Sequence, residues 1–198
     1  MSKPLNIALI IDMQYDFFAD DGTLKVNGGK QAVENAIERL KNTNYDAVFF
    51  TADFHPFKHC SFKENGGTWP QHCVAHTKGA AIPIDLMCAA YSNPNTTCVK
   101  VLKKGNNKNK EEYSFMQNVD SLCIFFSELN GKFLDEMTPQ YNIDIMGIAG
   151  DVCVLQTIKD LVTYRNKDNI TVVTDCIASL DGGIALTEYC TQNNIKMV

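Results

Sequence analysis

Apolar residues gather in continuous runs along the chain, and polar stretches with a different spacing separate the runs. An unbroken apolar run is typical of a strand that is covered on both faces, as in a parallel sheet. Four such strands are predicted, and a short fifth strand is expected near the C-terminus. They span residues 5–12, 45–51, 143–149, 169–174 and 195–198.

Between these runs, apolar positions recur every three or four residues, which predicts helices with one buried face. These helices are expected over residues 31–41, 152–164 and 181–192. Alternation of strands and helices predicts an α/β fold, a doubly wound, mostly parallel open sheet with helices on both faces. A length of 198 residues fits one domain, predicted over residues 1–198.

Chemistry-bearing residues stand where three of the predicted strands end. Asp12 ends the first strand, Asp53 follows the second, and the turn at 150–153 follows the third. In open parallel sheets the ligand binds beyond the carboxyl ends of the strands. The sequence therefore predicts one cleft to which all three strand ends contribute.

Charge and cysteine content narrow the class of protein. The formal net charge is −5, and the lysines at 103–110 alternate with asparagines before two glutamates, which indicates a solvated loop. Nucleic acid is therefore not an expected partner. The first apolar run ends at Asp12, so it is too short for a signal peptide or a membrane span, and no membrane association is expected. Eight cysteines without paired short spacings favour neither a zinc ribbon nor a disulfide framework, and they suit a cytoplasmic protein.

A long loop-like stretch at 53–78 contains every histidine of the chain: His55, His59, His72 and His76. Carboxylate and imidazole ligands suit zinc, iron or manganese, and Asp53 and His55 are spaced to face one ion from an extended segment. The alternative is a set of surface histidines that cluster by chance. We favour a divalent metal site with positions left open for water or substrate.

Cys153 stands out among the cysteines because it lies at a predicted strand-to-helix turn. The helix dipole and unpaired N–H groups there favour a thiolate, and the same groups can receive an oxyanion. The other seven cysteines are interpreted as small buried apolar residues. Asp12 is either a general base or a loop-ordering carboxylate. Lys103 and Lys104 have two interpretations. Lysines most often lie on the surface, but a lysine at the edge of a cleft can stabilise a neighbouring thiolate.

Together these segments resemble the nicotinamidase branch of the isochorismatase-like hydrolases, over about residues 7–178. The matching motifs, in order, are IIDMQYDF at 10–17, TADFHP at 51–56, WPQHCV at 69–74, KG at 104–105 and GIAGDVCV at 147–154. The resemblance implies a metal-dependent cysteine amidohydrolase that converts nicotinamide to nicotinate and ammonia through a thioester, in NAD salvage. A homo-oligomer is compatible with it.

The resemblance also implies roles for individual residues. Asp12, Lys104 and Cys153 would form the catalytic triad, and the N–H groups of Ala149 and Cys153 the oxyanion hole, after a cis peptide bond that precedes Ala149. Asp53, His55 and His72 would bind the metal, zinc or iron, while Phe17, Trp69 and Tyr113 would flank the pyridine ring.

Some positions depart from the pattern or leave a choice. His59 and Ser61 are expected to contact the metal through water or to support its ligands, and His76 has no implied role. Lys104 is chosen because it precedes the glycine and because strand alternation would turn Lys103 to the opposite side. Two alternatives stay open: a relative that hydrolyses another amide or a ureide, and a metal-binding protein without catalysis.

Overall fold

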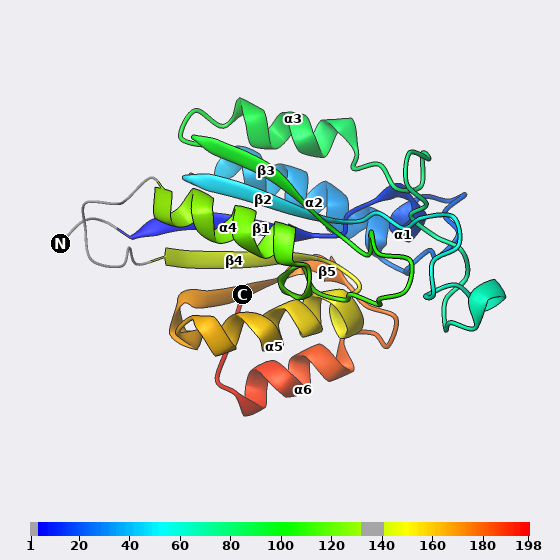
Figure 1. Cartoon of the computed structure of the whole chain (residues 1–198). Coiled ribbons are helices and arrows are strands. Elements are labelled where there is room, and N and C mark those ends of the chain that lie inside the picture. Colours follow the sequence, from blue (N-terminus) through cyan, green and yellow to red (C-terminus); the bar gives the residue numbers. More distant parts are fainter. Residues whose placement is uncertain (1–3, 132–140) are drawn as a thin grey trace.

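The protein folds around a six-stranded sheet whose strands are all parallel (Figure 1). The structure is a computed structural model that describes residues 4–131 and 141–198; the parts of the predicted domain at 1–3 and 132–140 lie outside the described residues. The strands are β1 (Leu5–Ile11), β2 (Ala47–Asp53), β3 (Cys98–Lys104), β4 (Tyr141–Ile148), β5 (Ile170–Ala178) and β6 (Lys196–Met197). They lie in the order β3-β2-β1-β4-β5-β6. β2 and β3 are therefore added on one side of β1, and β4, β5 and β6 on the other side.

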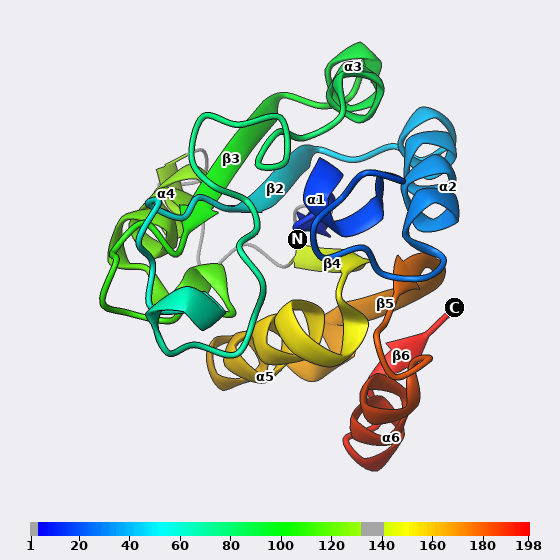
Figure 2. The same ribbon diagram turned by 90° about the vertical axis from the view of Figure 1, so that its right-hand side faces the viewer.

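Helices connect successive strands and cover both faces of the sheet (Figure 2). The helices are α1 (Tyr15–Phe18), α2 (Gly29–Asn42), α3 (Ile84–Ser92), α4 (Val119–Gly131), α5 (Leu155–Tyr164) and α6 (Ile184–Gln192). The predicted doubly wound α/β fold is therefore confirmed.

Side-chain alternation along β1 divides the apolar core into two halves. Ile7, Leu9 and Ile11 pack into a core with residues of α4, α5 and α6. Ala8 and Ile10 point the other way, into a core shared with α2 and α3. Both faces of β1 are thus buried, which explains why its sequence is apolar without alternation.

Several predicted elements differ from the observed ones. β3, α3 and α4 were not among the predicted strands and helices, and α6 begins at Ile184 rather than at residue 181. The predicted helix at 152–164 begins instead with a wide π-helical turn over Gly150–Val154, which runs into α5. The predicted loop at 53–78 begins with the last residue of β2 and contains a 3-10 turn at Lys63–Asn65 and two isolated bridges, His55 with Val74 and Phe62 with Trp69.

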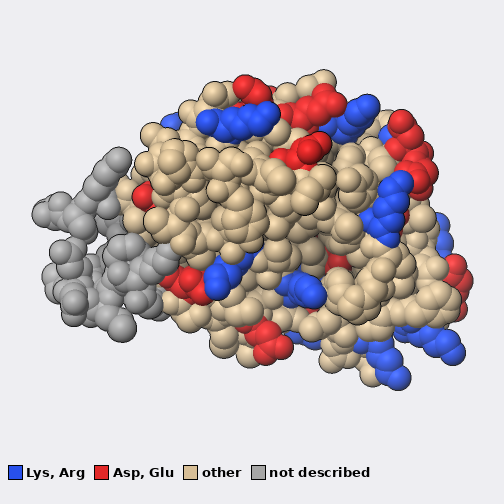
Figure 3. Space-filling view, turned by 90° about the horizontal axis from the view of Figure 1, so that it is seen from above, with Lys and Arg blue, Asp and Glu red and all other residues tan. Residues whose placement is uncertain are grey.

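The described surface carries charges of both signs. Figure 3 shows acidic and basic side chains interspersed on the face seen from above. Among the described residues, no helix combines the length and the apolar character needed to cross a bilayer.

Candidate active site

Four neighbouring strands of the sheet deliver functional side chains to one edge. Lys104 and Asp53 are the last residues of β3 and β2, and the register pairs them with each other. Asp12 directly follows β1, and Ala149 directly follows β4. Since parallel strands share their carboxyl edge, the strand order alone brings these four residues side by side.

Cys153 reaches this edge on the turn that follows β4. The peptide bond between Ile148 and Ala149 is cis, as the resemblance implies. The N–H groups of Val152 and Val154 both donate to the carbonyl oxygen of Ala149, at 3.1 Å each. This wide first turn places the Cys153 thiol under the end of β1.

Lys104 is the centre of the cluster, and its side chain is completely buried. Its Nζ lies 2.5 Å from Asp53 Oδ1 and 2.9 Å from Asp12 Oδ2. The same ammonium lies 3.5 Å from Cys153 Sγ and 3.3 Å from the carbonyl oxygen of Glu112. Lys103 points away, is exposed, and holds its Nζ 3.9 Å above the ring of Phe54. Lys104 is therefore the lysine that reaches the thiol.

The charges of the cluster compensate one another inside the protein. Burial acts to lower the pKa of Lys104, but Asp12 and Asp53 outweigh it and hold that pKa well above its usual range. Burial acts to raise the pKa of Asp53, but Lys104 and the neighbouring histidines hold it well below its usual range. For Asp12, burial and the charge of Asp53 raise the pKa despite Lys104. Asp12 is thus the carboxylate of the pair with the higher affinity for a proton.

The expectation of a thiolate at Cys153 is corrected by its surroundings. Burial raises the pKa of Cys153 well above its usual range, and Asp12 and Asp53 add to this effect while Lys104 only partly offsets it. These surroundings favour the thiol form of Cys153, from which a base has to remove the proton.

Two polar side chains that the sequence analysis missed hold the carboxylates in place. Thr51 donates its hydroxyl to Asp12 Oδ1 at 2.6 Å, and the Asp12 backbone has the left-handed φ of 48°. Gln14 accepts from the N–H of Asp53 and donates to its carbonyl oxygen, both at 2.8 Å. Gln14 lies within the motif at 10–17, so its place between two carboxylates was the signal that could have identified it.

Next to the lysine cluster, Asp53, His55 and His72 offer ligand atoms that lie within 4.8 Å of one another. His55 Nδ1 lies 3.0 Å from the carbonyl oxygen of Gly105, and His72 Nδ1 lies 2.8 Å from that of Pro70. A carbonyl can only accept, so each Nδ1 carries a hydrogen, and in the neutral imidazole each Nε2 then keeps its lone pair. These Nε2 atoms lie 3.6 and 3.8 Å from Asp53 Oδ2.

The Nε2 atom of His55 is buried and has no hydrogen-bond partner among the described residues. A buried polar atom without a partner is costly unless an ion or a water satisfies it. Two imidazoles in the correct tautomer and one carboxylate therefore fit a divalent metal ion.

The remaining histidines and Ser61 have different surroundings. His59 accepts from the N–H of Ser61 through Nδ1, and its Nε2 lies 3.0 Å from the carbonyl oxygen of Lys110. Both nitrogens are thus occupied, and the ring stacks on His55 at 4.1 Å instead of facing the cluster. Ser61 Oγ is buried without a partner among the described residues and lines the adjacent pocket. His76 is exposed.

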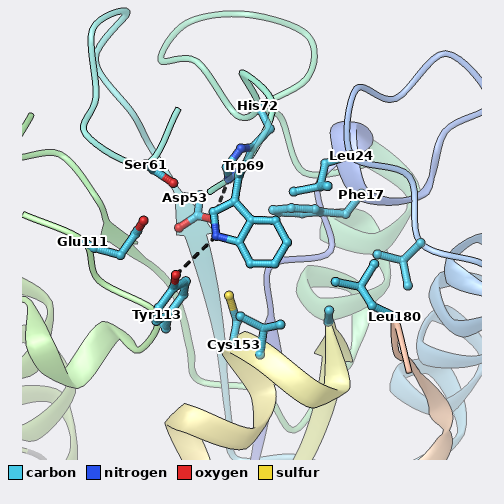
Figure 4. Close-up of a pocket in the computed structure, with 13 residues that line it drawn as sticks. Phe17, Leu24, Asp53, Ser61, Trp69, His72, Glu111, Tyr113, Cys153 and Leu180 are labelled. Carbon is cyan, nitrogen blue, oxygen red and sulfur yellow. Dashed lines mark hydrogen bonds and ion pairs between the residues drawn. The ribbon is translucent and has the colours of Figure 1, made fainter. Parts of the chain in front are cut away.

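A pocket opens directly over the thiol and the Asp–His–His group (Figure 4). Trp69 lies across it and donates its indole N–H to the hydroxyl of Tyr113 at 3.2 Å, and Phe17 forms the opposite wall beside His72. The pocket is lined by Phe17, Leu24, Val26, Asp53, Ser61, Trp69, His72, Glu111, Tyr113, Ala149, Val152, Cys153 and Leu180. Flat aromatic walls above a nucleophile suit a small planar ring.

Comparison with known proteins yields relatives that match nearly the whole chain. The chain is 31% identical over 197 residues to the nicotinamidase/pyrazinamidase of Mycobacterium tuberculosis, covering 96% of this chain and 96% of that protein. It is 30% identical over 196 residues to the nicotinamidase of Escherichia coli K12, covering 87% and 82%. The crystal structure of the pyrazinamidase of Pyrococcus horikoshii in complex with zinc superposes with a TM-score of 0.75 at 25% identity, covering 98% and 99%. No protein-family model matches the chain.

Proposed function

The chain belongs to the nicotinamidase family, and on that premise we propose that it hydrolyses nicotinamide to nicotinate and ammonia in NAD salvage. One observation carries the assignment of residues: a buried ammonium, Lys104 Nζ, contacts both Asp12 and the Cys153 thiol beside a group suited to a metal. We propose Cys153 as nucleophile, Asp12 as general acid and base, and Lys104 as the fixed positive charge between them.

Nicotinamide would bind with its ring between the aromatic walls of the pocket, flanked by Phe17, Trp69 and Tyr113. Asp53, His55 and His72 would hold a divalent ion, zinc or iron, which when bound supplies a Lewis-acid position for the ring nitrogen. Ser61 Oγ, which lines the same wall, would hold a water molecule next to that ion.

Acylation begins when Asp12 accepts the proton of the Cys153 thiol, which matches the raised proton affinity of this carboxylate. The sulfur forms a bond to the carboxamide carbon, and the N–H groups of Ala149 and Cys153 receive the charge that develops on the oxygen. The carbon–nitrogen bond then breaks as Asp12 returns its proton to the departing ammonia. Asp12 then accepts a proton from a water molecule, whose oxygen forms a bond to the thioester carbon. The carbon–sulfur bond breaks, nicotinate leaves, and Asp12 returns the proton to the Cys153 sulfur.

The two alternatives are less well supported. A hydrolase of a ureide has no need for a group that binds a ring nitrogen, whereas Asp53, His55 and His72 meet at the pocket. In a metal-binding protein without catalysis, burying a lysine beside a thiol would lower stability through desolvation and would serve no function. The eight free cysteines support a cytoplasmic location.

The direct test is release of ammonia from nicotinamide by the purified protein, measured with a coupled assay and compared with a carbamoyl compound. We expect turnover of nicotinamide and none of the carbamoyl compound. Faster turnover of the carbamoyl compound would contradict nicotinamide as the substrate and would support the hydrolase of a ureide.

Metal content provides a second prediction. Elemental analysis is expected to find about one divalent ion per chain, because Asp53, His55 and His72 converge as suitable ligands. The other converging group, Asp12, Asp53 and Cys153, already contacts the Lys104 ammonium. His72→Ala should lose this ion, whereas His76→Ala should keep it, since His76 is exposed and outside the cluster. Full nicotinamide turnover by metal-free protein would rule out a functional role for the ion.

A third prediction distinguishes the two lysines. Lys104→Ala leaves Asp12 and Asp53 buried without their cation, which costs about 3–5 kcal/mol of stability and should lower kcat/KM sharply. Lys103→Ala removes only an exposed contact with Phe54 and should change neither. Thermal unfolding and steady-state kinetics measure the two effects. The reverse ranking would contradict the assignment of Lys104.

A further inference from the structure

Glu112 is a buried carboxylate that has no role in the mechanism above, and only 3% of it is exposed. Its Oε2 accepts from the N–H of Gly105 at 2.9 Å and from Asn118 Nδ2 at 3.0 Å. Its Oε1 accepts from Lys110 Nζ at 2.8 Å. Three donors of the same loop thus converge on one side chain, which fixes the course of the chain from Gly105 to Asn118.

The contact with Gly105 reaches a proposed metal ligand directly. The carbonyl oxygen of Gly105 lies 3.0 Å from His55 Nδ1 and so determines which nitrogen of His55 carries the hydrogen. Gly105 also has the left-handed φ of 66°, and a Cβ there would lie 2.3 Å from Cε1 and 2.5 Å from Nδ1 of the His55 ring. The backbone is therefore pressed against the imidazole, and a shift of Gly105 must move the ring.

A second route runs through Lys110. The carbonyl oxygen of Lys110 lies 3.0 Å from His59 Nε2, and the His59 ring stacks on His55 at 4.1 Å. The side chain of Lys110 forms a salt bridge with Glu112, which holds Lys110 in place. Both routes that start at the Glu112 carboxylate therefore end at the same imidazole, one at its Nδ1 and one at its face.

We propose that Glu112 is a positioning residue of the metal site, one that keeps His55 in the tautomer and orientation in which Nε2 faces the ion. This inference rests on the metal site of the proposed function and adds a residue to it. A carboxylate that merely braced the loop would affect stability, but it would leave the affinity for the ion unchanged. Affinity is therefore the quantity that tests the role.

The experiment measures the Kd for zinc of the metal-stripped full chain by competition with a chromophoric chelator, below the unfolding temperature of each variant. Glu112→Ala should weaken zinc binding about tenfold or more, the range found when supports of ligating histidines are removed. Glu112→Gln keeps one oxygen that can accept from the N–H of Gly105 but turns its amide nitrogen toward Lys110. Its affinity for zinc should therefore fall less than that of Glu112→Ala. Excess zinc should restore the activity of both variants.

Asp46→Ala is the matched control. Asp46 Oδ2 accepts the N–H of Asn6 at 2.8 Å at the opposite edge of the sheet, so this variant loses a carboxylate–backbone bond far from the site. Its Kd for zinc should equal that of the unmodified chain.

An unchanged Kd in Glu112→Ala, or in Glu112→Gln if the alanine variant does not fold, would overturn the inference alone. Equal weakening by Asp46→Ala would do the same. Failure of the unmodified chain to bind zinc would overturn the metal part of the proposed function as well.

Discussion

Cys153→Ala is expected to abolish nicotinamide hydrolysis, with kcat lowered by at least about 10⁴-fold, because no other group can form the thioester. The Cys153 thiol lies under the pocket, 3.5 Å from Lys104 Nζ. Alanine keeps the backbone of the turn that follows β4, and loss of one sulfur atom should cost on the order of 1 kcal/mol of stability. Steady-state kinetics and thermal unfolding together separate lost chemistry from lost structure.

Cys176→Ala is the matched control, since Cys176 is also buried but lies in the core beneath α2. It should retain activity, and both variants should keep their metal. Acid quenching of the unmodified enzyme during turnover should trap a nicotinoyl adduct on the peptide that contains Cys153, visible by mass spectrometry. An adduct on another cysteine, or substantial turnover by Cys153→Ala, would exclude the covalent mechanism.

Simple alkylation does not identify this nucleophile. Cys88 and Cys123 are exposed, whereas Cys153 is buried and burial raises its pKa. Iodoacetamide should therefore modify the two exposed thiols first. Only a substrate bound in the pocket that Cys153 lines is expected to select this thiol.

The parallel sheet could be predicted because both faces of its central strands are buried. β1 and β4 pass between two cores, so apolar residues occupy both faces of β1 from Ile7 to Ile11 and of β4 from Ile145 to Ile148. α3 and α4 were missed for a related reason. Their sequences are IDLMCAAYS and VDSLCIFFSELNG. Both helices are apolar on most sides, so neither sequence shows a clear contrast between a polar face and an apolar face.

The ends of the strands could be predicted to form a site, because parallel strands place their last residues at one edge. Asp12, Asp53 and Cys153 are expected to lie together for this reason, and in the structure their ligand atoms lie within 4.8 Å of one another. The protonation of Cys153 could not be predicted, since desolvation depends on how completely the surrounding loops cover the thiol.

The supports of the site could not be predicted either. Glu112 reaches Gly105 across a loop, and Thr51 reaches Asp12 from the neighbouring strand. Such contacts follow from the path of the chain in three dimensions, and no periodicity or spacing in the sequence records them.

Asp12→Asn is expected to lower kcat by about 10²–10⁴-fold, because an amide cannot accept the proton of the Cys153 thiol. Asparagine tolerates the left-handed backbone of this position and can still accept from the Thr51 hydroxyl. Its amide nitrogen would face Lys104, which retains its contacts with Asp53 and with the carbonyl oxygen of Glu112. The variant should therefore fold with some loss of stability.

Binding and acylation decide between the two interpretations of Asp12 that the sequence left open. If Asp12 is the base, the asparagine variant should bind nicotinamide in calorimetric titrations with a Kd close to that of Cys153→Ala, while no nicotinoyl adduct forms on Cys153. If Asp12 only orders the loop, the conservative asparagine should preserve most of the turnover, because the hydrogen bond from Thr51 remains. Under both interpretations, Asp12→Asn is expected to leave the strands and helices around the pocket unchanged. An adduct that accumulates in Asp12→Asn would show that a different group removes the thiol proton, and Asp12 would then serve only in the later steps.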